Sequence, residues 1–134
     1  MTRIEVGRPV QADPSSVALV LAGPAARELW PPRSDRLIGA VAEQRPALSV
    51  TLDPPGRAGV GFTARARVHA GDRVVGTGRL TILPTSDSTV VEPAACEVRL
   101  SIEAADQIAE RLRRDAVRYL DNLAQLSRER SSAA

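Results

Sequence analysis

The chain has 134 residues, enough for one domain of ordinary size, and its 18 basic residues, all of them arginine, nearly balance 16 acidic ones. A single cysteine and a single histidine exclude an intrachain disulfide and a His/Cys zinc site, and three aromatic residues are too few for a stacking platform that binds single-stranded nucleic acid. The arginines form no basic run, so we expect no nucleic acid partner. We also expect no metal ion and no cofactor.

The first predicted element is a strand over residues 3–12, in which polar and apolar residues alternate. Ile4, Val6 and Val10 lie on one face of this strand. Pro9 has no backbone N–H to donate to a neighbouring strand, which is typical of a strand at the edge of a sheet.

A helix is predicted next, over about residues 14–29. Asp13 precedes Pro14, and a capping residue followed by proline is typical of a helix start. Apolar residues then recur at helical spacing at Val17, Leu21, Ala25 and Leu29. We expect the Gly-Pro pair at 23–24 to divide this helix into two short pieces. The second piece ends at Trp30, which two prolines follow.

The middle of the chain, residues 36–103, is rich in Val, Ile, Leu and Thr and lacks helical periodicity, which is typical of strands. Clusters of Gly, Pro, Asp and Ser separate most of the apolar runs, and such short connections imply antiparallel hairpins. The five predicted strands are Arg36–Glu43, Ala47–Asp53, Val60–Ala70, Arg73–Leu83 and Thr89–Ile102.

Alternation within two of these strands predicts which side chains face a core. In the strand over residues 60–70, the inward set is Val60, Phe62, Ala64, Ala66 and Val68. The outward set of the same strand is Thr63, Arg65, Arg67 and His69. In the last strand, the inward set is Val90, Ala94, Cys96, Val98, Leu100 and Ile102, and the outward set is Glu97, Arg99 and Ser101.

The longest predicted helix extends from Ala104 to about Arg128, with a frayed tail at residues 131–134. Its apolar stripe is formed by Ile108, Leu112, Ala116, Leu120 and Leu123. The predicted fold class is α+β, with one domain over residues 1–130. In it, a curved antiparallel sheet of about six strands wraps around the long C-terminal helix.

The chain contains no apolar run close to the ~20 residues that a membrane span requires, and its N-terminus lacks the apolar stretch of a signal peptide. We therefore expect a cytoplasmic protein with no membrane span, which a lone reduced cysteine also favours. The use of arginine without lysine is typical of a GC-rich genome of the actinobacterial type. The sequence makes no prediction about the oligomeric state.

This order of elements resembles the helix-grip fold of the START/Bet v 1-like superfamily, often labelled SRPBCC or polyketide cyclase/dehydrase. The segment Val10-Gln11-Ala12-Asp13-Pro14-Ser15-Ser16-Val17 is similar to the family's opening motif, and Glu28-Leu29-Trp30 is similar to the end of its short helix pair. The helix over Ile108–Leu126 matches the family's closing helix in length and position. The resemblance covers nearly the whole chain, and its motifs specify a fold without a catalytic signature.

The resemblance implies an apolar tunnel between the concave sheet and the terminal helix, which would bind a lipid, a sterol, a polyketide or another small apolar molecule. Trp30 would border its mouth. The sheet side would be lined by Phe62, Ala66, Val68, Leu80, Ile82, Cys96 and Val98. The helix side would be lined by Leu112, Ala116, Tyr119 and Leu123. A filled core without a ligand explains the same apolar residues.

Few residues are candidates for catalysis. His69 is predicted on the outer face, and Cys96 on the apolar face, where a thiol has a raised pKa and is inert. By the alternation of the last strand, Glu92 faces inward, and a buried carboxylate can act as an acid or a base. A bulge at the neighbouring Pro93 would instead turn Glu92 to the outer face. Tyr119 is the best polar group for binding a ligand's oxygen.

Three functions remain open on the sequence alone. The first is a module that binds a small apolar ligand, the second is an enzyme of the cyclase, aromatase or dehydratase type, and the third is a protein-interaction domain with a closed core. The scarcity of inward polar groups favours the first and the third. A hot-dog fold also wraps a sheet around a helix, but its long helix comes early in the chain, whereas here the longest helix is last.

Overall fold

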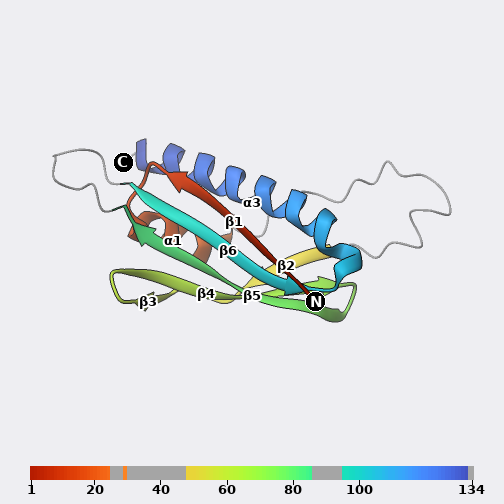
Figure 1. Ribbon diagram of the computed structural model, residues 1–134. Coiled ribbons are helices and arrows are strands. Elements are labelled where there is room, and N and C mark those ends of the chain that lie inside the picture. The colour runs from red at the N-terminus through yellow and green to blue at the C-terminus, as the bar shows by residue number, and fades with distance from the viewer. Residues whose placement is uncertain (25–28, 30–47, 86–94, 133–134) are drawn as a thin grey trace.

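The computed structural model describes residues 1–24, 29, 48–85 and 95–132, which form one antiparallel sheet and two helices (Figure 1). The strands are β1 (Thr2–Val10), β2 (Leu48–Leu52), β3 (Gly56–Ala58), β4 (Gly61–Ala70), β5 (Arg73–Pro84) and β6 (Cys96–Ala104), and the helices are α1 (Pro14–Ala22) and α3 (Asp106–Ser132). This confirms the predicted α+β helix-grip architecture. The predicted strand over residues 36–43 lies outside the described residues.

The strands follow the order β1-β6-β5-β4-β2, and β3 also pairs with β4. The first strand therefore pairs with the last, and Val10 lies opposite Cys96. β1 is at the edge of the sheet among the described residues, as Pro9 predicted. The hairpin between β4 and β5 turns at Gly71, whose φ of 62° lies in the left-handed region that glycine favours.

A bulge near this hairpin sets the faces of β5. Val68 lies opposite Gly76 and His69 opposite Val74, so Val75 has no partner of its own in β4. Because side chains alternate along a strand, one extra residue exchanges its two faces. Beyond the bulge, the even-numbered residues of β5 therefore face the core, and the odd-numbered ones face away from it.

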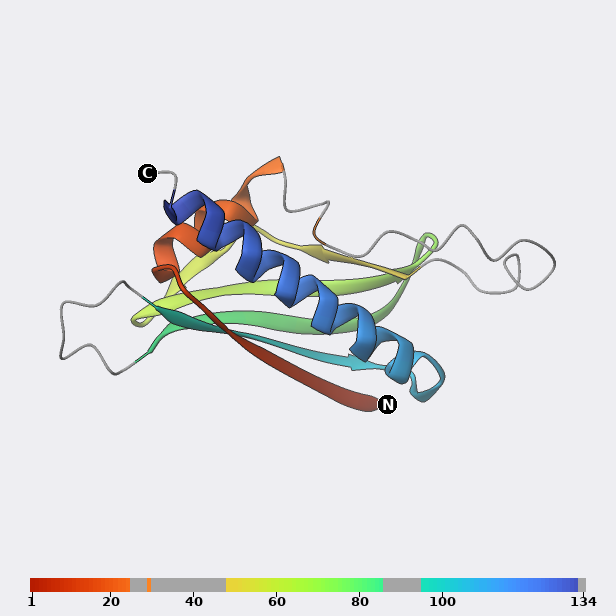
Figure 2. The same cartoon turned by 90° about the horizontal axis from the view of Figure 1, so that it is seen from above.

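Helix α3 lies along the concave side of the sheet, with α1 at one end (Figures 1 and 2). The backbone of α3 comes closest to β1 and next to β6, whereas α1 covers β4 and β5 at its end of the sheet. Polar contacts join α3 to the rest of the fold along its length. At its start, Asp106 accepts a hydrogen bond from the Thr2 hydroxyl and pairs with the Met1 ammonium at 3.5 Å. Arg8 Nε donates to Asp121 Oδ1 at 3.0 Å, and Asn122 Nδ2 donates to the Leu29 carbonyl oxygen at 2.9 Å.

The core lies between the sheet and the two helices. Its side chains with at most 2% exposure come from every layer and include Ile4, Val10, Val17, Val20, Val68, Leu80, Ile82, Leu100, Ile102, Leu112, Leu120 and Leu123. The predicted inward face of β1 is confirmed, since Ile4, Val6 and Val10 are buried. In β6, every second residue from Cys96 to Ile102 is buried, as predicted, whereas Val90 and Ala94 lie outside the described residues. Neither of the described helices is both long and apolar enough to span a membrane.

Two local predictions were wrong, and one short strand was not predicted. Val60 was expected to face the core, but 78% of it is exposed, because it lies in the turn between β3 and β4 beside Gly59, whose φ is 59°. The short strand β3 was not predicted, because Gly56, where it begins, directly follows two prolines and belongs to a cluster typical of a turn. Ala104 ends β6 and does not begin the long helix, which starts at Asp106 and continues to Ser132.

Candidate functional site

All predicted ligand-lining residues except Trp30 lie on the inner side of the fold, and Trp30 is outside the described residues. From the sheet, Ala66, Val68, Leu80, Ile82, Cys96 and Val98 are buried, and Phe62 is half-buried. From α3, Leu112, Ala116, Tyr119 and Leu123 are buried. The structure thus brings residues of four elements into one apolar layer. Their role in binding a ligand stays a prediction, because a close-packed core has the same burial.

Small residues gather on the inner side of β4 and β5. Ala66 lies directly opposite Gly78, and Val68 lies opposite Gly76. Ala64, two residues before Ala66, is also buried. The small residues are confined to the middle of these strands, because the inner positions toward one end carry Phe62, Leu80 and Ile82. In their middle part, β4 and β5 therefore contribute little side-chain volume to the inner side, and the backbone of α3 lies nearer to β1 and β6.

The buried polar groups of this region are held in their neutral forms. Burial raises the pKa of the Cys96 thiol to about 11, and the nearby carboxylate of Asp13 adds to the shift. Burial also raises the pKa of the Tyr119 phenol above its usual value. The inertness predicted for Cys96 agrees with this, since the thiolate is the nucleophilic form.

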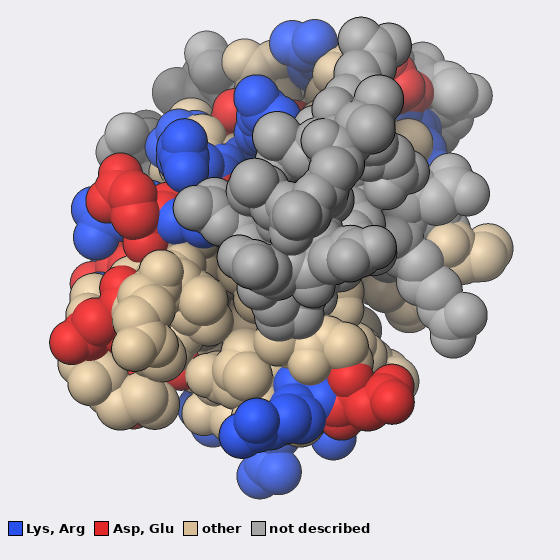
Figure 3. Space-filling model, turned by 90° about the vertical axis from the view of Figure 1, so that its right-hand side faces the viewer, with Lys and Arg blue, Asp and Glu red and all other residues tan. Residues whose placement is uncertain are grey.

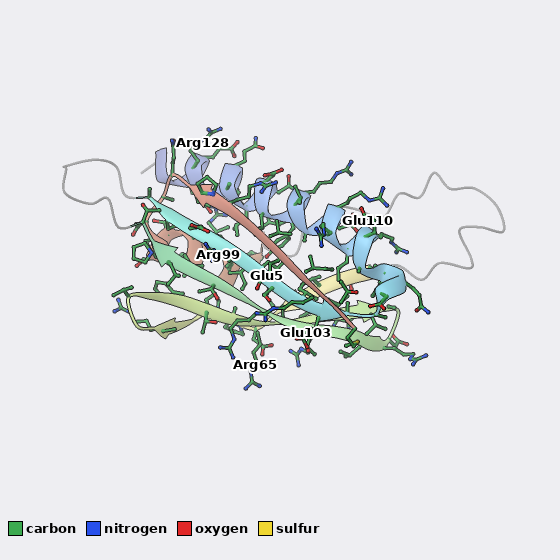
Figure 4. The ribbon with its side chains drawn as sticks, viewed as in Figure 1. Glu5, Arg65, Arg99, Glu103, Glu110 and Arg128 are labelled. Atoms are coloured by element: carbon green, nitrogen blue, oxygen red, sulfur yellow. The ribbon has the colours of Figure 1, made fainter. Side chains whose placement is uncertain are left out.

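The outer side of the sheet has a different chemistry. An open hollow of about 1100 Å³ lies there, and its lining includes five arginines and four carboxylates from β1, β4, β5, β6 and the residue after β2. Figure 4 shows Glu5, Arg65, Arg99 and Glu103 on this side, away from α3. We name this surface the outer hollow.

Three of its arginines form ion pairs in the outer hollow, all with partly exposed side chains. The nitrogen–oxygen distances are 3.2 Å for Arg3–Glu5, 2.5 Å for Arg67–Asp53 and 2.6 Å for Arg99–Glu97. The two other arginines, Arg65 and Arg79, lie directly opposite each other in β4 and β5. Neither has an ion pair with any described residue.

The outward positions of Arg65 and Arg67 were predicted, but the outer hollow was not. The alternation in β4 was the available signal, whereas the pairing of Arg65 with Arg79 depends on the bulge at Val68 and His69. His69 is half-buried opposite Ser49 and Val74.

Charges elsewhere are mixed. At the end of the molecule seen in Figure 3, basic and acidic side chains lie beside one another. The part of the chain that the structure describes contains no group of three or more His, Cys, Asp or Glu residues arranged to hold a metal ion. Glu92, the candidate acid or base, lies outside the described residues.

No protein-family model and no curated protein matches the sequence. Solved structures are similar in fold. An uncharacterised protein from Rhizobium leguminosarum has a TM-score of 0.50 at 13% identity, covering 96% of this chain and 95% of its own. The Mll3558 protein from Rhizobium loti has a TM-score of 0.50 at 12% identity, covering 92% and 95%. The Zhui aromatase/cyclase from a Streptomyces species has a TM-score of 0.45 at 14% identity, covering 96% and 94%. At these identities the likeness shows a shared fold alone.

Proposed function

We propose that this protein binds a small apolar molecule between α3 and the inner side of β4 and β5. The observation that supports this location is the placement of small residues there, with Ala66 directly opposite Gly78, while the backbone of α3 lies over β1 and β6. Small side chains on the part of a curved sheet that α3 does not cover leave volume that a ligand can fill between the sheet, α3 and α1. Apolar walls around such a volume favour a lipid-like, sterol-like or polyketide-like molecule.

Tyr119 gives this site a polar group for orienting the ligand. Its side chain is 2% exposed, and its phenol is protonated at neutral pH, because the ordinary pKa of 10.0 already lies well above 7 and burial raises it further. A protonated phenol donates a hydrogen bond to a carbonyl or hydroxyl oxygen. The ligand we propose is therefore an apolar molecule that carries at least one oxygen.

The inner groups favour binding over catalysis. Among the described residues, the fully buried side chains on this side are apolar, apart from the Tyr119 hydroxyl, the Cys96 thiol and the Ser127 hydroxyl. A cyclase or aromatase needs an acid or a base that titrates near neutral pH. The raised pKa values of Cys96 and Tyr119 move both groups away from that range. We propose a carrier or sensor of the ligand, acting in the cytoplasm, where a free cysteine stays reduced.

The substitution Ala66→Phe tests the site, with uptake of a fluorescent fatty acid and the melting temperature as the two measurements. If the inner side of β4 holds a ligand volume, the phenyl ring fills it, uptake is lost and the melting temperature stays the same or rises. If the same place is a packed core, the added ring destabilises the fold by about 1–3 kcal/mol.

Ala104→Phe is the matched control. A Cβ at Gly76 would lie 3.1 Å from the Ala104 Cβ, so Ala104 already packs against the neighbouring strand. We expect Ala104→Phe to lower the melting temperature. The proposal is overturned if the unmodified protein takes up neither the fatty acid nor a sterol or aromatic polyketide probe.

A further inference from the structure

We infer that the outer hollow binds a small phosphate monoester between Arg65 and Arg79. This site lies on the opposite side of the sheet from the proposed apolar ligand, and it does not depend on that proposal. The strand register places Arg65 and Arg79 side by side, and three ion pairs lie around them.

Arg65 and Arg79 are direct cross-strand neighbours. The Cβ atoms of such a pair lie roughly 4.5–5.5 Å apart, and like charges in these positions repel each other. Neither guanidinium has an ion pair with a described residue, while the sheet keeps both on the same face. An anion between them converts this repulsion into two charge-assisted contacts.

The surroundings separate this pair from the other arginines of the hollow. Arg3, Arg67 and Arg99 are each paired with a carboxylate, and the hydrogen bond to Glu97 raises the pKa of the Arg99 guanidinium further. Their charges are compensated within the protein. The uncompensated positive charge of the outer hollow is therefore concentrated at Arg65 and Arg79, and Glu103 is the remaining carboxylate of its lining.

Hydroxyl groups complete the place where a phosphate would bind. Thr77 and Thr81 flank Arg79 in β5 and line the hollow. Ser101 lies opposite Arg79 in β6 and accepts a hydrogen bond from Arg3 Nε at 3.2 Å. Each hydroxyl can donate to a phosphate oxygen.

The chemistry of the hollow selects a monoester. Two guanidinium forks match the three terminal oxygens of a phosphate group, and the volume of about 1100 Å³ leaves room for the organic part. The carboxylates of Glu5, Asp53, Glu97 and Glu103 surround the arginines and repel a polyanion. This favours a small soluble ligand over nucleic acid or an acidic membrane.

The test is calorimetric titration of the full chain with glycerol 3-phosphate and with inorganic phosphate, at constant ionic strength set with chloride. We expect both to bind, the monoester more tightly. Arg65→Gln and Arg79→Gln should each weaken binding roughly tenfold or more, since each removes charge-assisted hydrogen bonds. The control Arg113→Gln removes the same charge from the exposed surface of α3 and should change the Kd less than twofold.

A second measurement separates loss of the site from damage to the fold. Without phosphate, Arg65→Gln should raise the melting temperature, because it relieves the cross-strand repulsion, and Arg113→Gln should leave it unchanged. The inference is overturned if neither phosphate compound binds, or if Arg113→Gln weakens binding as much as Arg65→Gln. It is also overturned if only vesicles containing phosphatidic acid bind, with no binding of the soluble monoester.

Discussion

The close approach of β5 to β6 predicts that any side chain at Gly78 destabilises the sheet. A Cβ built on Gly78 would lie 2.0 Å from the carbonyl oxygen of Ser101 and 2.8 Å from the Cα of Ile102. Both atoms belong to the backbone of β6, so no side-chain rotation relieves the overlap, and the two strands must separate. We therefore expect Gly78→Ala to disturb the pairing at the middle of the sheet.

The magnitude follows from two opposing effects. Overpacking costs about 1–3 kcal/mol, and a backbone obstacle places this site near the upper end. Replacing glycine also restricts the unfolded chain, which contributes about 0.4–1 kcal/mol in the stabilising direction. The net loss is about 2 kcal/mol, which lowers the melting temperature of a chain of this length by roughly 7 °C.

Gly56→Ala is the matched control, because a Cβ at Gly56 meets nothing within 4 Å. It should leave the melting temperature unchanged or raise it by roughly 1–3 °C. Differential scanning calorimetry of both variants gives the comparison. Equal melting temperatures for the two variants would refute the reasoning, since the obstacle at Gly78 would then carry no cost.

Three further predictions concern the core, the contact of α3 with β1, and the buried thiol. Leu120→Ala should lower the free energy of unfolding, measured by urea denaturation, by about 2–5 kcal/mol, because Leu120 is 1% exposed. The control Leu19→Ala, in a helix but 72% exposed, should stay within about 0.5 kcal/mol of the parent. Similar losses of stability for both variants would contradict the described core. The ion pair of Arg8 and Asp121, at 3.0 Å, should have a coupling free energy of only about 0.2–1 kcal/mol in a double-mutant cycle, because both side chains are partly exposed. A coupling free energy well above this range would contradict that exposure. The pKa of Cys96 is raised from 9.0 to about 11, so the unfolded chain releases this proton at lower pH than the folded chain. The stability that the thiol contributes is therefore complete below pH 9 and is lost as the pH rises toward 11. Cys96→Ala should reduce the difference in the free energy of unfolding between pH 8 and pH 10. An unchanged difference would show that the thiol does not cause this pH dependence.

Much of the architecture could be predicted because burial and periodicity coincide in this chain. Ile4, Val6 and Val10 alternate in a strand with one buried face, and Leu112, Leu120 and Leu123 recur at helical spacing on the buried side of α3. The edge position of β1 followed from the missing N–H of Pro9.

The remaining features depend on contacts between distant residues. By alternation Val60 belongs with the inward residues of β4, but it lies in the turn beside Gly59, and β4 begins only at Gly61. If the pairing next to the hairpin turn continued without a bulge, Arg65 would lie opposite Gly78. Because Val75 is an extra residue in β5, the register shifts by one residue, and Arg79 lies opposite Arg65. The candidate outer site therefore could not be predicted, whereas the inner apolar layer could.

The pairing of β1 with β6 also has a consequence for synthesis. Paired residues in these two strands are roughly ninety positions apart, a non-local contact of the kind that slows folding. At about 5–20 residues per second, a ribosome takes on the order of 5–20 s to make the chain between them. During that interval β1 has no partner in β6, and α3, its other main contact, has not yet been made. Ile4, Val6 and Val10 then remain accessible to water or to a chaperone until the last strand and the last helix leave the ribosome.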